Sequence, residues 1–174
     1  QHASAYDGVP KIFVDLALLE GQHAKEKYLE KGSNSQRIKL VGIPKFDPYF
    51  GKINENHQIQ RLGFCTNRSM DFQETKETLT YIRQEFPNLK IILRPHPTAE
   101  PSGKYAQIIQ QLGLAYSNAN KEPAFLFLQD VDVVISGNSS ILLEAAILNV
   151  VPIYIFSDNT KRFYSHDRFD KYDY

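Results

Sequence analysis

A run of small polar residues, Ser136-Gly137-Asn138-Ser139-Ser140, has the composition of an anion-binding loop. Short side chains let the backbone approach a ligand closely, and a helix that follows such a loop presents unpaired N–H groups to a phosphate. The hydroxyls of Ser139 and Ser140 add further donors. The same residue types also favour the cap of an ordinary helix. The loop alone therefore leaves both interpretations open.

Glu144 favours the phosphate-binding interpretation. A capping box would place an acid three residues after the capping serine, where this sequence has leucine. Glu144 instead lies four residues after Ser140, on the same helical face, and it is the only charge between Asp132 and Asp158. An ionised carboxylate in apolar surroundings needs a polar partner. We expect ribose hydroxyls to be that partner; the alternative is a solvent-facing position on a partly exposed helix.

A second candidate site is the Arg-Pro-His-Pro motif at residues 94–97. Each proline fixes its own φ and pushes the residue before it into an extended conformation, so the loop should hold His96 stiffly. An imidazole can donate to a phosphate or protonate a leaving group near neutral pH. Arg94 can complement the same negative charge. The alternative is a surface loop that contains a histidine.

Other residues give weaker signals. Thr66 and Asn67 could contact a phosphate, although turn chemistry explains them equally well. The histidines and Cys65 show no spacing typical of a metal site, and Cys65 fits a core position. The sequence has neither G-x-G-x-x-G nor a Walker A motif, so nicotinamide or P-loop chemistry has no support. The aromatic and charged stretch 163–169 could cover a site, but a solvated edge element is the simpler interpretation.

The composition indicates one globular domain with some additional chain. Of the 174 residues, 42% are hydrophobic, including ten Tyr and eleven Phe, which suffices for a substantial core. Twenty basic and twenty acidic residues cancel, which argues against a nucleic-acid partner or a polybasic membrane surface. The single cysteine suits a reducing compartment. No run approaches the roughly 20 apolar residues that span a bilayer. Because the chain begins with Gln and shows no signal-peptide pattern, we expect a piece of a longer, cytoplasmic protein.

The elements that must position the candidate residues alternate regularly from residue 61 onward. Apolar runs predict strands at 62–65, 89–93, 114–116, 131–135 and 150–156. Helical spacing predicts helices at 71–86, 104–112, 122–128 and 139–148, with Gly113 and Asn149 ending two of them. Strands that alternate with helices through short loops predict an α/β fold with a Rossmann-like, doubly wound parallel sheet. Ligands of such sheets bind outside the carboxyl ends of the strands, where the candidate loops fall.

Together, the motif at 94–97 and the pair Ser139-Ser140 with Glu144 resemble the carboxyl-terminal half of GT-B enzymes that build bacterial surface polymers. Similar families are the CDP-glycerol glycerophosphotransferases of teichoic acid synthesis, capsule polymerases, and bacterial sialyl- and polysialyltransferases. Those families carry a His-Pro and a Ser-Ser motif that bind the phosphates of the nucleotide donor. The resemblance implies the same role for His96, Ser139 and Ser140, and ribose contact for Glu144.

The resemblance extends towards the amino end of the chain. Residues 41–47 look like the segment that leads into this domain, and Gln1-His2 resembles a loop in which histidine serves the acceptor, with Ala3 in place of its glycine. We therefore expect the end of a truncated amino-terminal domain at 1–42 and an interdomain linker at 43–60. A Rossmann-like nucleotide-binding domain at 61–157 and a carboxyl-terminal extension at 158–174 complete this half of a two-domain GT-B enzyme.

The resemblance implies transfer of a sugar or polyol phosphate from a CMP-, CDP- or UDP-linked donor to a capsule or other cell-surface glycan. His96 and His2 are the catalytic candidates. The expected phosphate-binding residues are Arg94, Thr66, Gly137, Asn138, Ser139 and Ser140. Neither a metal nor a cofactor is required, because Arg, His and helix amides can neutralise the developing charge. The intact enzyme should work at the inner face of the cytoplasmic membrane, associated through the missing part, and the fragment alone should be inactive.

Two other functions remain open. The UDP-N-acetylglucosamine 2-epimerases share the fold and have a Ser-Gly-Gly loop, whose start Ser136-Gly137 matches; the second glycine and the paired acids that follow it are absent. The other alternative is a non-catalytic module that binds a nucleotide or a partner, because GT-B catalysis takes place between two domains.

Overall fold

The computed structural model describes residues 10–49, 58–68, 70–99 and 103–155. The chain forms two compact units, one from residues 1–50 and 162–174 and the other from residues 51–161. The expected domain bounds, with the linker at 43–60, stay a prediction. His2 and the extension at 158–174 lie outside the described residues.

The first unit contains a small β-α-β arrangement that the sequence patterns did not predict. Strand β1 (Ala17–Leu19) pairs in parallel with β2 (Ile38–Leu40), and helix α1 (Gln22–Glu30) connects them. One short 3-10 helix, Ser35–Arg37, lies between α1 and β2, and another, Pro44–Tyr49, follows β2. Leu19, Ala24 and Ile38 form its buried core.

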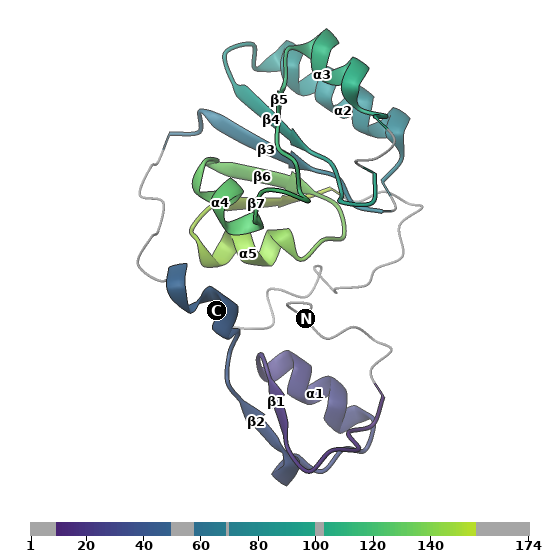
Figure 1. Ribbon diagram of the computed structural model, residues 1–174, viewed down its shortest axis with the longest axis vertical. Coiled ribbons are helices and arrows are strands. Elements are labelled where there is room, and N and C mark those ends of the chain that lie inside the picture. Colours follow the sequence, from purple (N-terminus) through teal and green to yellow (C-terminus); the bar gives the residue numbers. More distant parts are fainter. Residues whose placement is uncertain (1–9, 50–57, 69, 100–102, 156–174) are drawn as a thin grey trace. The chain divides into compact units, whose positions relative to one another are not determined.

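The second unit is built on a parallel sheet of five strands in the order β5-β4-β3-β6-β7 (Figure 1). The strands are β3 (Arg61–Cys65), β4 (Lys90–Arg94), β5 (Ala115–Tyr116), β6 (Val133–Ser136) and β7 (Val151–Tyr154). The chain builds outward from β3 to β5, then returns to the other side of β3 for β6 and β7. Strand order thus reverses between β3 and β6, and the predicted Rossmann-like doubly wound fold is confirmed.

Helices cover both faces of this sheet. Helices α2 (Phe72–Glu85) and α3 (Ala106–Leu112) pack beside each other, and α4 (Ala124–Gln129) packs beside α5 (Ile141–Ile147) (Figure 1). Along β3 the residues alternate between the two layers: Leu62 and Phe64 belong to the core formed with α2 and α3, whereas Gly63 faces Phe127 of α4. This alternation explains why the strands are apolar on both faces.

The predicted elements from residue 61 onward all occur, with ends that shift by a few residues. Asp71 caps α2 through its side chain, Gly113 ends α3 with φ 58°, and Asn149 adopts φ 57° after α5. Three helices begin two residues later than predicted, and one of them is α5, which begins at Ile141 rather than 139. Helix α3 begins at Ala106 rather than 104, and Pro123 precedes α4 as its N-cap rather than lying in its first turn.

Replacing Gly63 with alanine is expected to destabilise the second unit by about 1–3 kcal/mol, because the helix α4 layer would be overpacked. A Cβ at Gly63 would lie 2.6 Å from Cζ of Phe127 and 3.3 Å from Cγ2 of Val134. Phe127 is 1% exposed and therefore has little room to move. Urea unfolding measures the loss; Gly21→Ala, where a Cβ meets nothing within 4 Å, is the control. Equal midpoints for the two variants would contradict the packing argument.

Candidate functional site

Three loops leave the carboxyl edge of the sheet side by side. In the register of the strands, Cys65 at the end of β3 lies opposite Arg94 at the end of β4 on one side and Ser136 at the end of β6 on the other. The loops at 66–70, 95–99 and 137–140 therefore begin on neighbouring strands. The first and third flank the point where the strand order reverses, which is where open α/β sheets bind ligands.

Thr66 joins the first two of these loops. The N–H of His96 donates to Oγ1 of Thr66 over 2.9 Å, and the N–H of Thr66 donates to the carbonyl of Arg94 over 3.1 Å. Tyr105 is hydrogen-bonded to the same threonine side chain, although burial dominates and raises the pKa of Tyr105. Thr66 is buried and holds His96 in place. Phosphate contact by Thr66 itself stays a prediction.

The imidazole of His96 is half-buried and held by its own loop. Its Nδ1 lies 2.8 Å from Oγ1 of Thr98 and accepts the N–H of Thr98 over 3.2 Å. Burial, followed by the charge of Arg68, lowers the pKa of His96 below its usual value. The imidazole is therefore neutral at pH 7, and because Nδ1 accepts a hydrogen bond, the proton resides on Nε2. His96 thus offers a neutral N–H donor.

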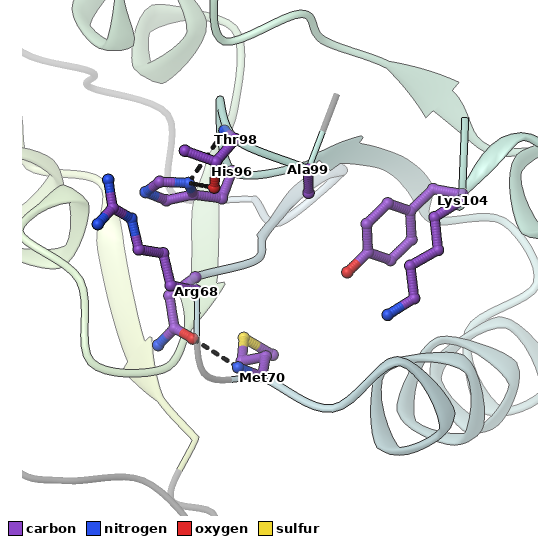
Figure 2. Close-up of a pocket in the computed structure, with 8 residues that line it drawn as sticks. Arg68, Met70, His96, Thr98, Ala99 and Lys104 are labelled. Atoms are coloured by element: carbon purple, nitrogen blue, oxygen red, sulfur yellow. Dashed lines mark hydrogen bonds between the residues drawn. The ribbon is translucent and has the colours of Figure 1, made fainter. Parts of the chain in front are cut away.

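His96 lies in a pocket of about 460 Å³ (Figure 2). Three of its lining residues belong to the loop after β3 and three to the loop after β4. The complete set is Asn67, Arg68, Met70, His96, Thr98, Ala99, Lys104 and Tyr105. Sequence reasoning missed Arg68 and Lys104. Arg68 directly follows the Thr66-Asn67 pair at a strand end, and that position was a usable signal.

The loops after β3 and β6 approach each other through Gly137. A Cβ at Gly137 would lie 2.7 Å from Nδ2 of Asn67 and 3.4 Å from Met70, so a side chain there would push the loops apart. Asn67 in turn accepts the N–H of Met70 through Oδ1 over 2.8 Å, and Ser136 donates to the carbonyl of Cys65 over 2.7 Å. A glycine at position 137 is therefore explained by close loop packing, and Asn138 beside it is buried.

Ser139 and Ser140 are half-buried at the start of α5. Oγ of Ser139 accepts the N–H of Ile141 over 3.4 Å, whereas Ser140 caps the helix without using its side chain. Neither serine lines the His96 pocket. The structure thus brings His96 and the two serines to the same sheet edge, on strands separated only by β3, but in adjoining loops rather than in one cavity.

Arg94 is placed differently from the expectation. Its guanidinium is buried and donates through Nη1 to Oγ of Ser117 over 2.5 Å and to Oε2 of Glu122 over 3.2 Å, and through Nη2 to the carbonyl of Glu122 over 2.7 Å. It also lies 4.9 Å from the ring centroid of Phe127. Arg94 therefore ties β4 to the segment before α4. Phosphate contact by Arg94 stays a prediction that this placement does not favour.

Glu144 is buried in α5, with 6% of its surface exposed, which excludes the solvent-facing alternative. It lies within electrostatic range of Cys65 at the end of β3. Burial raises the pKa of Cys65 to about 12, the charge of Arg94 opposes the rise and the charge of Glu144 adds to it. Cys65 is accordingly a protonated core residue, as expected, and not a nucleophile. Ribose contact by Glu144 stays a prediction.

The described residues contain neither a candidate metal site nor a helix that could span a membrane. No group of three or more His, Cys, Asp or Glu side chains within 10–49, 58–68, 70–99 and 103–155 is arranged to hold a metal ion. No helix in that part of the chain is both long enough and apolar enough to cross a membrane.

No family model and no curated protein matches this chain. Among solved structures it is similar to UDP-N-acetylglucosamine 2-epimerase from Rickettsia bellii, with a TM-score of 0.60 and 18% identity over 90% of this chain and 45% of that one. Anabaena HepE, solved in complex with UDP and glucose, gives a TM-score of 0.44 and 14% identity over 82% of this chain and 44% of that one. The likeness to the epimerase supports the α/β Rossmann-like fold, and this chain spans about 45% of the epimerase chain.

Proposed function

We propose that this chain is the nucleotide-donor-binding part of a transferase that moves a sugar or polyol phosphate onto a bacterial capsule or cell-surface polysaccharide. The observation that carries the proposal is that three strand-end loops contact one another. The backbone N–H of His96 donates to Oγ1 of Thr66, and Asn67, next to Thr66, packs against Gly137. Because neighbouring strands are about 4.8 Å apart, the loops after β4 and β6 begin about 10 Å from each other. A nucleoside diphosphate can bridge that interval.

In the proposed reaction, the acceptor hydroxyl attacks the transferred group and gives up its proton to water, while the bond from that group to the nucleotide phosphate breaks and its electron pair stays on the phosphate oxygen. Negative charge then builds on the departing phosphate. Nε2–H of His96 donates to this oxygen, and the hydroxyls of Ser139 and Ser140 hold the remaining oxygens in the adjoining loop. Donors placed in advance where charge develops stabilise a transition state most effectively. Glu144 accepts from the ribose hydroxyls.

Thermal unfolding of the 174-residue chain with CMP, CDP, UDP and NAD tests the proposal. A pyrimidine nucleotide should raise the melting temperature, because a ligand that binds only the folded state stabilises it. His96→Ala should abolish the shift. His23→Ala, the same change on α1 in the other unit, should keep it. Stabilisation by NAD alone, or a shift that survives in His96→Ala, would contradict the proposal.

The epimerase alternative is supported by Ser136-Gly137, which matches the start of the Ser-Gly-Gly loop of the epimerases. The similarity of fold does not discriminate between the two reactions. Turnover of an isotope-labelled donor by the full-length protein does. A transferase moves the labelled group onto the acceptor glycan, whereas an epimerase returns the label in a nucleotide sugar of changed stereochemistry.

Donor affinity is expected to increase as the pH falls through the range just below pH 7. The pKa of His96 is lowered in the free protein by burial and by Arg68. A bound phosphate favours the imidazolium and raises that pKa, so the complex takes up a proton and binding strengthens as pH decreases. Below the free-state pKa the affinity should level off. Calorimetry with UDP-glucose or CDP-glycerol measures this without interference, because their esterified phosphates lack the titration near pH 6 of a terminal phosphate. A pH dependence retained in His96→Gln would refute the assignment to this histidine.

A further inference from the structure

The pocket around His96 is lined by cations from two different segments. Arg68 belongs to the loop after β3, and Lys104 lies two residues before α3. Figure 2 shows Arg68 beside His96 and Lys104 on the opposite side of the pocket. Of the eight described residues that line the pocket, two carry a full positive charge and none is acidic.

The surroundings keep both charges at the pocket. The charge of Arg68 acts on the imidazole, since it contributes to the lowered pKa of His96. The Nζ of Lys104 lies 4.7 Å from the ring centroid of Phe72, which positions the ammonium by a cation–π contact.

The pKa of Asp71 is lowered, mainly by hydrogen bonds from the backbone N–H groups of Glu74 and Gln73 and to a smaller extent by the charge of Lys104. Its Oδ1 accepts the N–H groups of Gln73 over 2.7 Å and Glu74 over 3.1 Å. Asp71 is therefore directed at the start of α2, where the helix dipole already favours its negative charge. It does not line the pocket.

We propose that Arg68 and Lys104 select a donor that carries two phosphates, a nucleoside diphosphate ester, over a nucleoside monophosphate ester. This inference rests on the proposed function, because it assumes that the His96 pocket receives the donor's phosphates. A pyrophosphate diester carries two negative charges and a phosphate diester carries one. With His96 neutral, the two positive charges of Arg68 and Lys104 balance the two negative charges of a pyrophosphate diester. A phosphate diester would leave one of these positive charges unbalanced. Coulomb attraction between neighbouring unit charges then favours the diphosphate.

Calorimetry with CDP-glycerol and the methyl ester of CMP tests this inference. The two ligands share cytidine and an esterified terminal phosphate, and CDP-glycerol carries a second phosphate and a glycerol group in place of the methyl group. CDP-glycerol should bind at least about tenfold more tightly to the unmodified chain. Arg68→Gln and Lys104→Met should each weaken the binding of CDP-glycerol by about tenfold. Lys104→Met should change the affinity for the methyl ester by less than about twofold, because a single phosphate held at His96 lies beside Arg68 and across the pocket from Lys104. Methionine at position 104 keeps an apolar stem against Phe72 while removing the charge.

Lys90→Gln controls for the change in net charge, because exposed Lys90 lies at the amino end of β4, at the other edge of the sheet. Its affinities should match those of the unmodified chain. Equal affinity of the unmodified chain for the two ligands, or a weakening of both ligands in Lys104→Met, would overturn the inference. The proposed function would still stand if binding depended on His96. Failure of both ligands to bind, or binding that does not depend on His96, would instead contradict the proposed function itself. Circular dichroism of each variant verifies that the fold persists.

Discussion

Replacing His96 with alanine in the full-length protein is expected to lower the turnover of donor by about 10²–10⁴-fold, the range typical of a positioned proton donor. The reason is geometric. Nδ1 accepts the N–H of Thr98 and the backbone of His96 is tied to Thr66, so Nε2–H is fixed before the donor binds. Alanine removes that donor and leaves the developing phosphate charge with fewer hydrogen bonds. Steady-state kinetics with saturating acceptor measures the loss.

Two conservative variants separate the roles of the imidazole. His96→Gln can supply an N–H close to the position of Nε2, whereas His96→Asn can supply an acceptor close to Nδ1 and no donor at the far position. If His96 only donates a hydrogen bond, glutamine should recover much of the activity that alanine and asparagine lack. If His96 transfers its proton to the leaving group, all three variants should be equally impaired. Activity of His96→Ala within tenfold of the unmodified enzyme would exclude either role.

The Rossmann-like unit could be predicted because its local signals agree with its fold. Buried parallel strands are apolar on both faces, so the run at 131–135 is recognisable without knowledge of its neighbours. Gly113 and Asn149 mark two helix ends because left-handed backbone favours these residue types, and both adopt positive φ. The sequence patterns predicted a doubly wound sheet but not the strand order β5-β4-β3-β6-β7, because the rule that crossovers are right-handed does not determine which strands become neighbours.

The amino-terminal unit escaped prediction because its elements are too short for periodicity. Strands β1 and β2 have three residues each, and three residues cannot establish an alternation. Helix α1 lacks a side-chain cap hydrogen bond at Gly21. The core of the amino-terminal unit consists of Leu19, Ala24 and Ile38, and no local sequence pattern relates these three positions.

At the candidate site, the sequence located the loops but could not assign each charge. Arg94 and His96 are two residues apart, yet the strand end directs the buried guanidinium of Arg94 into an ion pair with half-buried Glu122, 28 positions later. Only the fold relates those positions. The cations that do line the pocket, Arg68 and Lys104, come from segments whose proximity again depends on the tertiary structure.

Asp132 is the polar exception in the apolar run at 131–135, and Asp132→Ala is expected to destabilise the second unit by about 2–4 kcal/mol. Its buried Oδ2 accepts the N–H groups of Gln60 over 3.0 Å and Arg61 over 2.8 Å, and Oδ1 lies 3.4 Å from the guanidinium of Arg61. Alanine would leave these donors at the start of β3 without their acceptor. Urea unfolding monitored by circular dichroism measures the change.

Two variants at and beside this carboxylate reveal what it contributes. Asp132→Asn keeps an oxygen that can accept the backbone N–H groups, so its loss should be about half as large if those bonds dominate. Asp130→Ala removes a more exposed carboxylate whose oxygen lies 4.0 Å from the same arginine, and should change stability by less than about 0.5 kcal/mol. A loss in Asp132→Asn as large as in Asp132→Ala would assign the stabilisation to the charge on Asp132. An unchanged midpoint in Asp132→Ala would show that β3 does not need this anchor, and the polar residue directly before β6 would then lack a structural reason.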